Sequence, residues 1–262
     1  MSNRGGAWGG RAPAALAVLS DVHGNLGALD AVLDDVSARG IRNIVHLGDA
    51  VYGPLDPRGT AERMIERAIP SVRGNEDRLV AFPEGRNATV DFTRSELRAD
   101  HVRWLTEFPP TIAWDGLYLC HGTPRDDATY LLLDVSPSGV RARSPSEVAA
   151  LVEGLEAAVV LCGHDHTPGA VRLPGGVLVA NPGSVGCPAY EDDQPAPHRI
   201  ENGTPHARYA ILSLRDNEWT CQRIAVPYDW DAAAALAGKN GRPDWSFALA
   251  TGRTCRARHE PC

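Results

Sequence analysis

Lysine is almost absent from this sequence. Lys239 is the single lysine among 26 basic residues, so arginine supplies nearly all of the positive charge, which we attribute to compositional bias rather than to function. The 33 acidic residues leave a formal net charge of -7. Phosphate backbones attract basic surfaces. The charge balance therefore argues against binding of long nucleic acid, whereas a small phosphate ester held by metal ions remains compatible with it.

Paired cysteines of the CxxC type are also missing. The sequence has six scattered cysteines, at positions 120, 162, 187, 221, 255 and 262. This spacing excludes a zinc ribbon and a thioredoxin-type motif. We therefore expect reduced thiols in a cytoplasmic protein.

Long apolar runs are the third absence. No run approaches the roughly 18 residues that a membrane-spanning helix needs. The stretch "APAALAVLS" is too short for the apolar region of a signal peptide and lacks a cleavage site after it. We interpret it as a buried strand and expect no association with a membrane.

The chain instead alternates between strand and helix patterns. Residues 16–20 and 41–47 predict strands, each followed by a polar turn and an apolar repeat at helical spacing, over 26–36 and 60–68. Residues 69–73 predict a third strand, 93–108 one helix, and 111–121 a hairpin turning at Asp115 and Gly116. Later short apolar strands, including 207–214 and 219–226, predict a second, more antiparallel sheet packed on the first. The fold class is therefore α/β.

The composition predicts three segments along the chain. Residues 1–13 are rich in glycine and predict a flexible tail, and residues 14–237 have enough apolar content for a single domain. Within this domain, residues 186–206 are polar and rich in proline, which predicts a loop that could act as a lid. Residues 238–262 show little periodicity and predict an extension on the surface.

Polar side chains gather directly after the predicted strands. In an open α/β sheet the carboxyl ends of the strands form one edge where ligands bind. We therefore expect seven separated side chains to converge there: Asp21, His23, Asp49, Asn75, His121, His164 and His166.

The types of these residues indicate metal binding. Mixed oxygen and nitrogen donors suit manganese, iron, zinc or nickel, and seven donors are too many for one tetrahedral zinc. Two metal ions that share a bridging carboxylate would use them all, which is typical of phosphoester hydrolysis. Each residue alone has a simpler explanation, since Asp21 could cap a helix and Asn75 could occupy a turn.

The motifs "SDVHGN", "LGDAVYG", "RGNED", "CHG" and "CGHDH" resemble those of the calcineurin-like metallophosphoesterases. The later "ANPGSVG" and "ARYAILSL" are similar to the small bacterial, YfcE-like phosphodiesterase branch. The resemblance implies a four-layer α/β/β/α sandwich of two packed mixed sheets. It also implies two divalent metal ions, with Mn²⁺ the first expectation and Fe, Zn, Ni or Mg compatible.

The resemblance assigns a role to each candidate ligand. Asp21, His23 and His166 match ligands of a first metal, Asn75, His121 and His164 match ligands of a second, and Asp49 matches the bridging carboxylate. In the family mechanism a metal-bound hydroxide attacks phosphorus. We expect the residues closest to that chemistry to be Asp49, Asn75, Glu76 and His164.

Two positions depart from the family pattern. Glu76 stands where many members have a histidine that helps to protonate the leaving group, and an ionised glutamate only accepts hydrogen bonds. This favours phosphodiesters or activated esters over monoesters with poor leaving groups. Asp165 lies between the two histidines of "CGHDH", where we expect it to cap the turn rather than to add charge beside the metals.

Substrate contacts are assigned by proximity to the ligands. Arg73 and Arg125 flank ligand positions and could hold phosphate, and Tyr52 could line the pocket. The predicted function is hydrolysis of a small or medium phosphoester. A protein serine/threonine phosphatase and a non-catalytic metal-binding scaffold of the same fold are the alternatives, and the sequence leaves the oligomeric state open.

Overall fold

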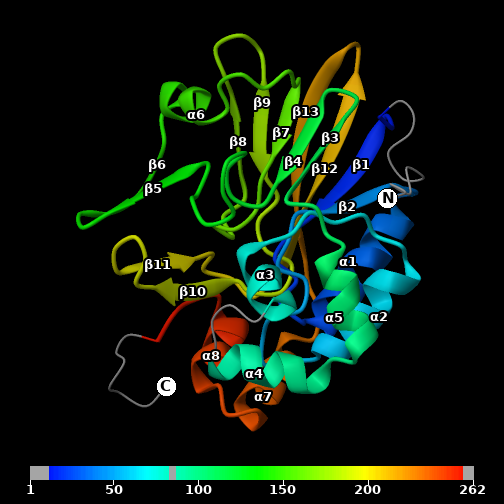
Figure 1. The fold of residues 1–262 in the computed structure, drawn as a ribbon, viewed down its shortest axis with the longest axis vertical. Coiled ribbons are helices and arrows are strands. Elements are labelled where there is room, and N and C mark those ends of the chain that lie inside the picture. Colours follow the sequence, from blue (N-terminus) through cyan, green and yellow to red (C-terminus); the bar gives the residue numbers. More distant parts are fainter. Residues whose placement is uncertain (1–11, 83–86, 256–262) are drawn as a thin grey trace.

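The computed structural model describes residues 12–82 and 87–255, so residues 1–11 of the predicted tail lie outside the described residues. Ala12 is buried, and its backbone N–H donates to Oδ2 of Asp115 at 2.7 Å. The described chain forms two packed sheets with helices on both outer faces and two separate hairpins (Figure 1).

The first sheet has the strand order β13-β12-β1-β2. Its strands are β1 (Ala15–Leu19), β2 (Ile44–His46), β12 (Ala207–Arg215) and β13 (Glu218–Val226). Strand β1 pairs parallel to β2 and antiparallel to β12. The sequence patterns at 207–214 and 219–226 thus form strands as expected, but in the first sheet and not in the second.

The second sheet has the order β3-β4-β7-β9-β8. It consists of β3 (Thr111–Trp114), β4 (Leu117–Cys120), β7 (Val159–Leu161), β8 (Gly169–Arg172) and β9 (Leu178–Asn181). The three central strands are parallel, and the edge strands β3 and β8 are antiparallel to their neighbours. Both sheets are therefore mixed.

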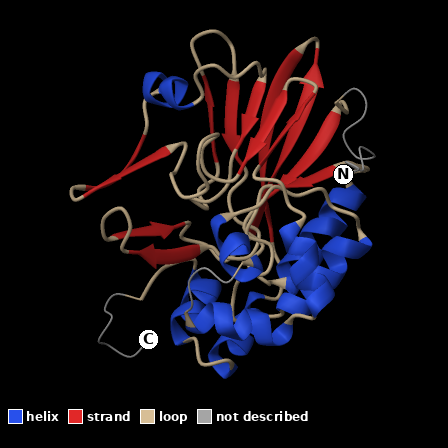
Figure 2. Cartoon of the chain, in the orientation of Figure 1, coloured by secondary structure: helices blue, strands red, loops and turns tan. Residues whose placement is uncertain are grey.

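Alternating side chains on the strands create the layers. On β1, Leu16 and Val18 face the core between the sheets, whereas Ala17 and Leu19 face the helices. Helices α1 (Leu26–Ala38), α2 (Pro57–Glu66) and others cover the first sheet, and α6 (Pro145–Leu151) packs on the outer face of the second (Figure 2). This is the predicted α/β/β/α sandwich.

The helix predicted over residues 93–108 is in fact two helices. Helix α4 (Ala88–Glu96) and helix α5 (Ala99–Thr106) are separated by Leu97 and Arg98, whose backbones are extended. The expected third strand is reduced to a single bridge between Ser71 and His46, after which α3 (Asn75–Ala81) begins.

Residues 186–206 contain regular structure and not only an irregular loop. They include a hairpin of β10 (Ala189–Asp192) and β11 (His198–Glu201), which lies beside a second hairpin of β5 (Leu133–Ser136) and β6 (Gly139–Ala142) (Figure 1). On β11, His198 and Ile200 are buried while Arg199 and Glu201 are exposed. Burial of alternate residues stabilises the hairpin, which the proline-rich composition did not suggest.

Most of residues 230–251 are also helical. Helix α7 (Trp230–Lys239) and helix α8 (Pro243–Thr251) pack together, with Ala237 and Leu249 buried against Leu55. The boundary predicted at residue 237 falls inside α7. The segment showed little periodicity because these short helices bury only small faces.

Within the described residues, no helix has the length and apolar character to cross a membrane. Cys120, Cys162, Cys187 and Cys221 are free thiols. Cys255 is disulfide-bonded, so the expectation of reduced thiols is wrong at that position. The absence of CxxC pairs excludes particular motifs but not a disulfide elsewhere.

Candidate functional site

The turns that follow the strands hold five candidate ligands in an unusual backbone conformation. Asp21, His23, Asp49, His164 and His166 have φ angles of 55°, 52°, 60°, 70° and 53°. Positive φ is uncommon for residues other than glycine, and such strain gathers at functional sites. The local backbone is therefore shaped to direct these side chains to one place.

The first cluster joins the turn after β1 to the turn after β7. The potential ligand atoms of Asp21, His23 and His166 lie within 4.8 Å of one another. Nε2 of His166 is 3.0 Å from Nε2 of His23 and 3.3 Å from Oδ1 of Asp21. All three side chains are buried.

The second cluster joins the turns after β2, β4 and β7. It contains Asp49, His121 and His164, again within 4.8 Å. Nε2 of His121 lies 3.3 Å from Oδ2 of Asp49 and 2.9 Å from Oδ1 of Asn75, which places Asn75 at the same point. The fold thus brings all seven predicted ligands together in two adjacent groups.

Backbone carbonyls orient all four histidines among the candidate ligands. In three of the rings the Nδ1 atom faces a backbone carbonyl oxygen. The distance is 3.0 Å from His23 to Tyr52, 2.7 Å from His121 to Leu47 and 2.8 Å from His166 to Cys187. In His164 the contact is reversed, with Nε2 lying 2.9 Å from the Ala128 oxygen. A ring nitrogen that donates to a carbonyl leaves the other nitrogen's lone pair for a cation.

The carboxylates complete a donor set that fits divalent cations. Oδ1 of Asp21 is buried and has no hydrogen-bond partner, as expected of an oxygen reserved for an ion. Asp49 belongs to the second cluster and also groups with His23 of the first, so it lies between the two. Its Oδ1 accepts from the Glu76 N–H at 2.9 Å, which leaves Oδ2 facing His121.

The electrostatics of the clusters follow from burial and close charges. Burial lowers the pKa of His164 to about 4, helped by the neighbouring His121. Burial would also lower the pKa of His121, but Asp49 outweighs it and raises the value to about 10. For Asp49, burial is outweighed by His121, and the pKa falls to about 2. His164 is thus neutral near pH 7, as metal binding requires, whereas His121 is charged and has to release its proton to bind a cation.

Glu76 lies at the edge of the clusters. Its Oε2 is 3.2 Å from Nδ1 of His23. Burial, followed by the nearby Asp49, raises the pKa of Glu76 to about 7. A glutamate with this pKa exists partly in the protonated form at neutral pH, and only that form can donate a proton.

Asp77 supports the site, although no role was predicted for it. Its carboxylate accepts three backbone N–H groups, from Asp49 at 2.8 Å, Ala50 at 2.9 Å and Gly74 at 3.0 Å. These bonds join the turn that carries Asp49 to the start of α3, which carries Asn75. The motif "RGNED" contained Asp77, but spacing alone could not show where its side chain points.

Asp165 caps the turn between the two histidines, as predicted. Its Oδ1 accepts from the Thr167 N–H at 2.8 Å and from Nδ2 of Asn181 at 3.0 Å. Ser184 also acts here, because its hydroxyl donates to the Asp21 carbonyl at 2.8 Å. Asn181 and Ser184 come from "ANPGSVG", so that motif holds the ligand turns in place.

Two cavities open beside the clusters. One, of about 280 Å³, is lined by ligands and by Tyr52, Glu76, Cys187, Tyr190, Glu191, Asp192, Arg242 and Trp245. The other, of about 420 Å³, is lined by residues that include Tyr130, Leu133, Val135 and Arg143. Asn75, His164 and Asp192 line both cavities, so the two meet at the ligand clusters.

The predicted substrate residues are only partly at these cavities. Tyr52 lines the smaller one, but neither Arg73 nor Arg125 lines either cavity. The Arg73 guanidinium lies over the Phe82 ring at 5.4 Å, and Arg125 is exposed. The cavity-lining arginines are Arg242 and Arg143, which are distant in sequence from the ligand motifs and could not be found by proximity.

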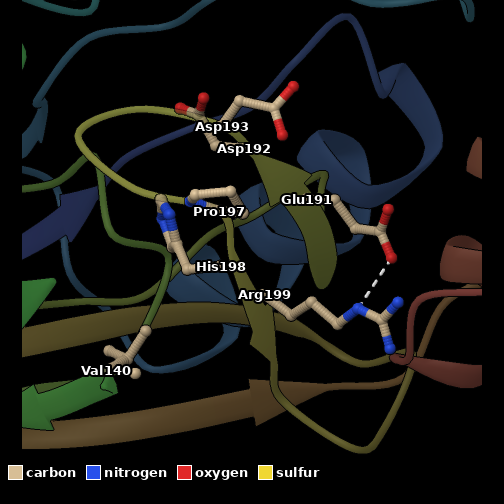
Figure 3. Close-up of a pocket in the computed structure, with 8 residues that line it drawn as sticks. Val140, Glu191, Asp192, Asp193, Pro197, His198 and Arg199 are labelled. Carbon is tan, nitrogen blue, oxygen red and sulfur yellow. Dashed lines mark ion pairs between the residues drawn. The ribbon is translucent and has the colours of Figure 1, made fainter. Parts of the chain in front are cut away.

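A third cavity, of about 780 Å³, lies between the two hairpins (Figure 3). It is lined by Val140 on one side and by the acidic residues Glu191, Asp192 and Asp193 with Pro197 and His198 on the other. Glu191 forms an ion pair with Arg199 at 2.8 Å across the β10–β11 hairpin (Figure 3). None of the candidate metal ligands lines this cavity.

Comparison with known proteins decides the family. Residues 15–203 match the calcineurin-like phosphoesterase superfamily domain. The chain belongs to this superfamily. Its members are metal-dependent phosphoesterases, so the protein is placed among hydrolases and its two clusters are candidate sites for divalent metal ions. The resemblance inferred from the ordered motifs is thereby confirmed.

The similarity of this superfamily member to individual proteins extends over nearly its whole length. An uncharacterised protein of Methanocaldococcus jannaschii is 26% identical over 88% of this chain and 94% of its own. A metallophosphoesterase from Sphaerobacter thermophilus is 26% identical with a TM-score of 0.71, covering 91% of this chain and 99% of its own. A hypothetical protein from Pyrococcus horikoshii has the same fold, with a TM-score of 0.71 at 20% identity, covering 92% and 99%.

Proposed function

We propose that the protein is a dinuclear metal-dependent phosphodiesterase acting on a small or medium organic phosphate. The observation that supports two ions is the pairing of the clusters. Asp21, His23 and His166 would hold one ion, Asn75, His121 and His164 would hold the other, and Asp49 lies between them. Two ions in such a site neutralise the phosphoryl oxygens and acidify a water molecule.

The chain's own residues contribute orientation. The carbonyls bound to the histidine rings fix which nitrogen faces the centre. Asp77 joins the turn of Asp49 to the start of α3, and Asn181 holds the turn of His164 and His166, so the donors are in place before substrate binds. Glu76 faces the cavity and, in its protonated form, could give a proton to a leaving oxygen.

The lining of the cavities supports diesters over monoesters. A diester carries two organic groups on phosphorus, and two cavities meet at the clusters to receive them. Glu191 and Asp192 line the smaller cavity. These carboxylates disfavour the second negative charge that a monoester carries near neutral pH.

A metal-rescue experiment tests the proposal. Chelator-stripped protein is expected to be inactive on bis(p-nitrophenyl) phosphate, and Mn²⁺ is expected to restore hydrolysis with two ions bound per chain by elemental analysis. The rate on p-nitrophenyl phosphate should be lower at equal substrate. Asp49→Asn should abolish turnover, with Asp34→Asn on the exposed face of α1 as the matched control.

Three outcomes would overturn parts of this proposal. Metal-independent turnover would contradict the mechanism. Two bound ions without turnover on any ester would support a metal-binding scaffold instead. Faster hydrolysis of a phosphoserine peptide than of the diester would favour a protein phosphatase.

A further inference from the structure

The C-terminal helices place an aromatic ring beside the first ligand cluster. The centroid of the Trp245 ring, on α8, is 5.8 Å from that of His23, with the planes at 70°. Trp245 also passes close to Gly53, where an added Cβ would lie 3.4 Å from its ring and 2.4 Å from the His23 carbonyl oxygen. Position 53 therefore has to be small because a side chain would collide with the His23 carbonyl, whereas the Trp245 ring lies at ordinary contact distance.

Tyr52 and Arg242 line the same cavity as Trp245. The Tyr52 ring is 6.4 Å from the His23 ring, and the Arg242 guanidinium lies 5.7 Å from the Trp245 ring centroid. Arg242 donates to Asp244 at 2.9 and 2.6 Å and to the hydroxyl of Thr89. These contacts fix the guanidinium against the ring.

One side of Trp245 packs against the protein, and another side faces the cavity. It packs at the border of a small core that contains Leu55, Ala237 and Leu249, and Asn240 donates to the Pro54 carbonyl at 2.8 Å. The tryptophan itself is only half-buried and lines the cavity. A residue needed only for the core would be buried there, whereas this ring presents part of its surface to the space beside the ligands.

We propose that Trp245, with Tyr52, forms a subsite for a flat aromatic substituent of the phosphoester substrate, and that Arg242 positions the tryptophan. The cavity of about 280 Å³ accommodates a single ring system. Aromatic faces bind flat rings by stacking and by edge-to-face contact. This inference rests on the proposed function, and it names residues beyond residue 203, where the family match ends.

Calorimetry with two phosphonates tests the subsite without turnover. Phenylphosphonate and ethylphosphonate differ in the group attached to phosphorus, and the full-length protein is first loaded with Mn²⁺. Phenylphosphonate is expected to bind about three- to tenfold more tightly than ethylphosphonate. Trp245→Leu should remove this difference while leaving the affinity for ethylphosphonate unchanged, and Trp245→Phe should keep most of it.

Trp230→Leu is the matched control, because Trp230 belongs to the same helical pair but does not line the cavity. It should keep the full preference for the phenyl group. An unchanged preference in Trp245→Leu, equal loss of both ligands, or no binding of either by the wild type would overturn the subsite. Normal preference without ester hydrolysis would refute the proposed function and leave the subsite intact.

Discussion

The side-chain amide of Asn181 donates to Oδ1 of Asp165 at 3.0 Å, and a second bond at 2.8 Å from the same amide reaches the Gly163 carbonyl. Both partners belong to the turn that presents His164 and His166. Strand β9 therefore fixes a ligand turn that follows strand β7. The spacing of the two histidines depends on a residue that binds no cation itself.

Replacing Asn181 should weaken metal binding. Asn181→Ala leaves buried polar atoms of the turn without partners, which should lower the free energy of unfolding by about 1–3 kcal/mol. Metal affinity should fall about 10- to 100-fold, as for other residues that orient ligands. Mn²⁺ titration and urea denaturation measure the two effects. Asn240→Ala is the control, and equal metal affinity in both variants would contradict the prediction.

Asp77→Asn should disturb the other half of the site. An asparagine oxygen can keep the bonds from Asp49 and Gly74, but its amide group then faces the Ala50 N–H that Oδ1 of Asp77 now accepts. Loss of that bond leaves the buried Ala50 N–H unpaired and should lower the free energy of unfolding by about 1–3 kcal/mol. The kcat for bis(p-nitrophenyl) phosphate should fall more than KM rises. A proportional rise in KM alone would argue against a positioning role.

The convergence of the candidate ligands could be predicted because nearly all of them lie in short turns directly after strands, although Asn75 begins helix α3. Strand ends converge by the general geometry of the sheet, so chain order sufficed to gather Asp21, Asp49 and His164. The cavity walls could not be predicted in the same way. Trp245 reaches the site only through packing of α8 on α7 and Leu55. No local pattern encodes that contact.

Proximity in sequence was a poor guide to the substrate side chains. Arg73 is two residues from Asn75, yet its guanidinium lies over Phe82, because helix α3 begins at Asn75 and the two side chains do not belong to one extended strand. The hairpin at 189–201 was missed for another reason. Buried His198 and Ile200 alternate with exposed neighbours over only four residues. So short an alternation does not predict a strand in a segment rich in proline.

Gly74 should tolerate no side chain. A Cβ at this position would lie 2.1 Å from Oδ1 of Asp49 and 2.6 Å from its backbone nitrogen, so Gly74→Ala has to displace the central carboxylate. Turnover should fall at least about 100-fold, as expected for misplacement by about 1 Å. Gly27→Ala is the control on α1, where an added Cβ finds nothing closer than 3.9 Å. It should leave activity unchanged and stabilise the helix by about 0.5–1 kcal/mol.

Asp35 should stabilise the fold in a manner that depends on pH. Its carboxylate accepts from Arg39 at 2.7 Å and from the hydroxyl of the buried Tyr209 at 2.6 Å. Arg39, outweighing the effect of burial and helped by Tyr209, lowers the pKa of Asp35 below its ordinary value. Because the pKa is lowered on folding, the stabilisation is complete above the pKa that Asp35 has in the unfolded chain, about 4. It is lost as the pH falls through the pKa that Asp35 has in the folded protein.

Asp35→Asn should therefore lower the free energy of unfolding by about 1 kcal/mol at pH 7. The difference in free energy of unfolding between the wild type and this variant should be constant from pH 7 to about pH 5 and should shrink below about pH 4. Urea denaturation with a chelator present at each pH measures it without a contribution from bound metal. Asp34→Asn, at an exposed neighbouring position of α1, should match the wild type throughout. A gap that widens on acidification would contradict the sign, because it would mean that the folded state raises the pKa of Asp35.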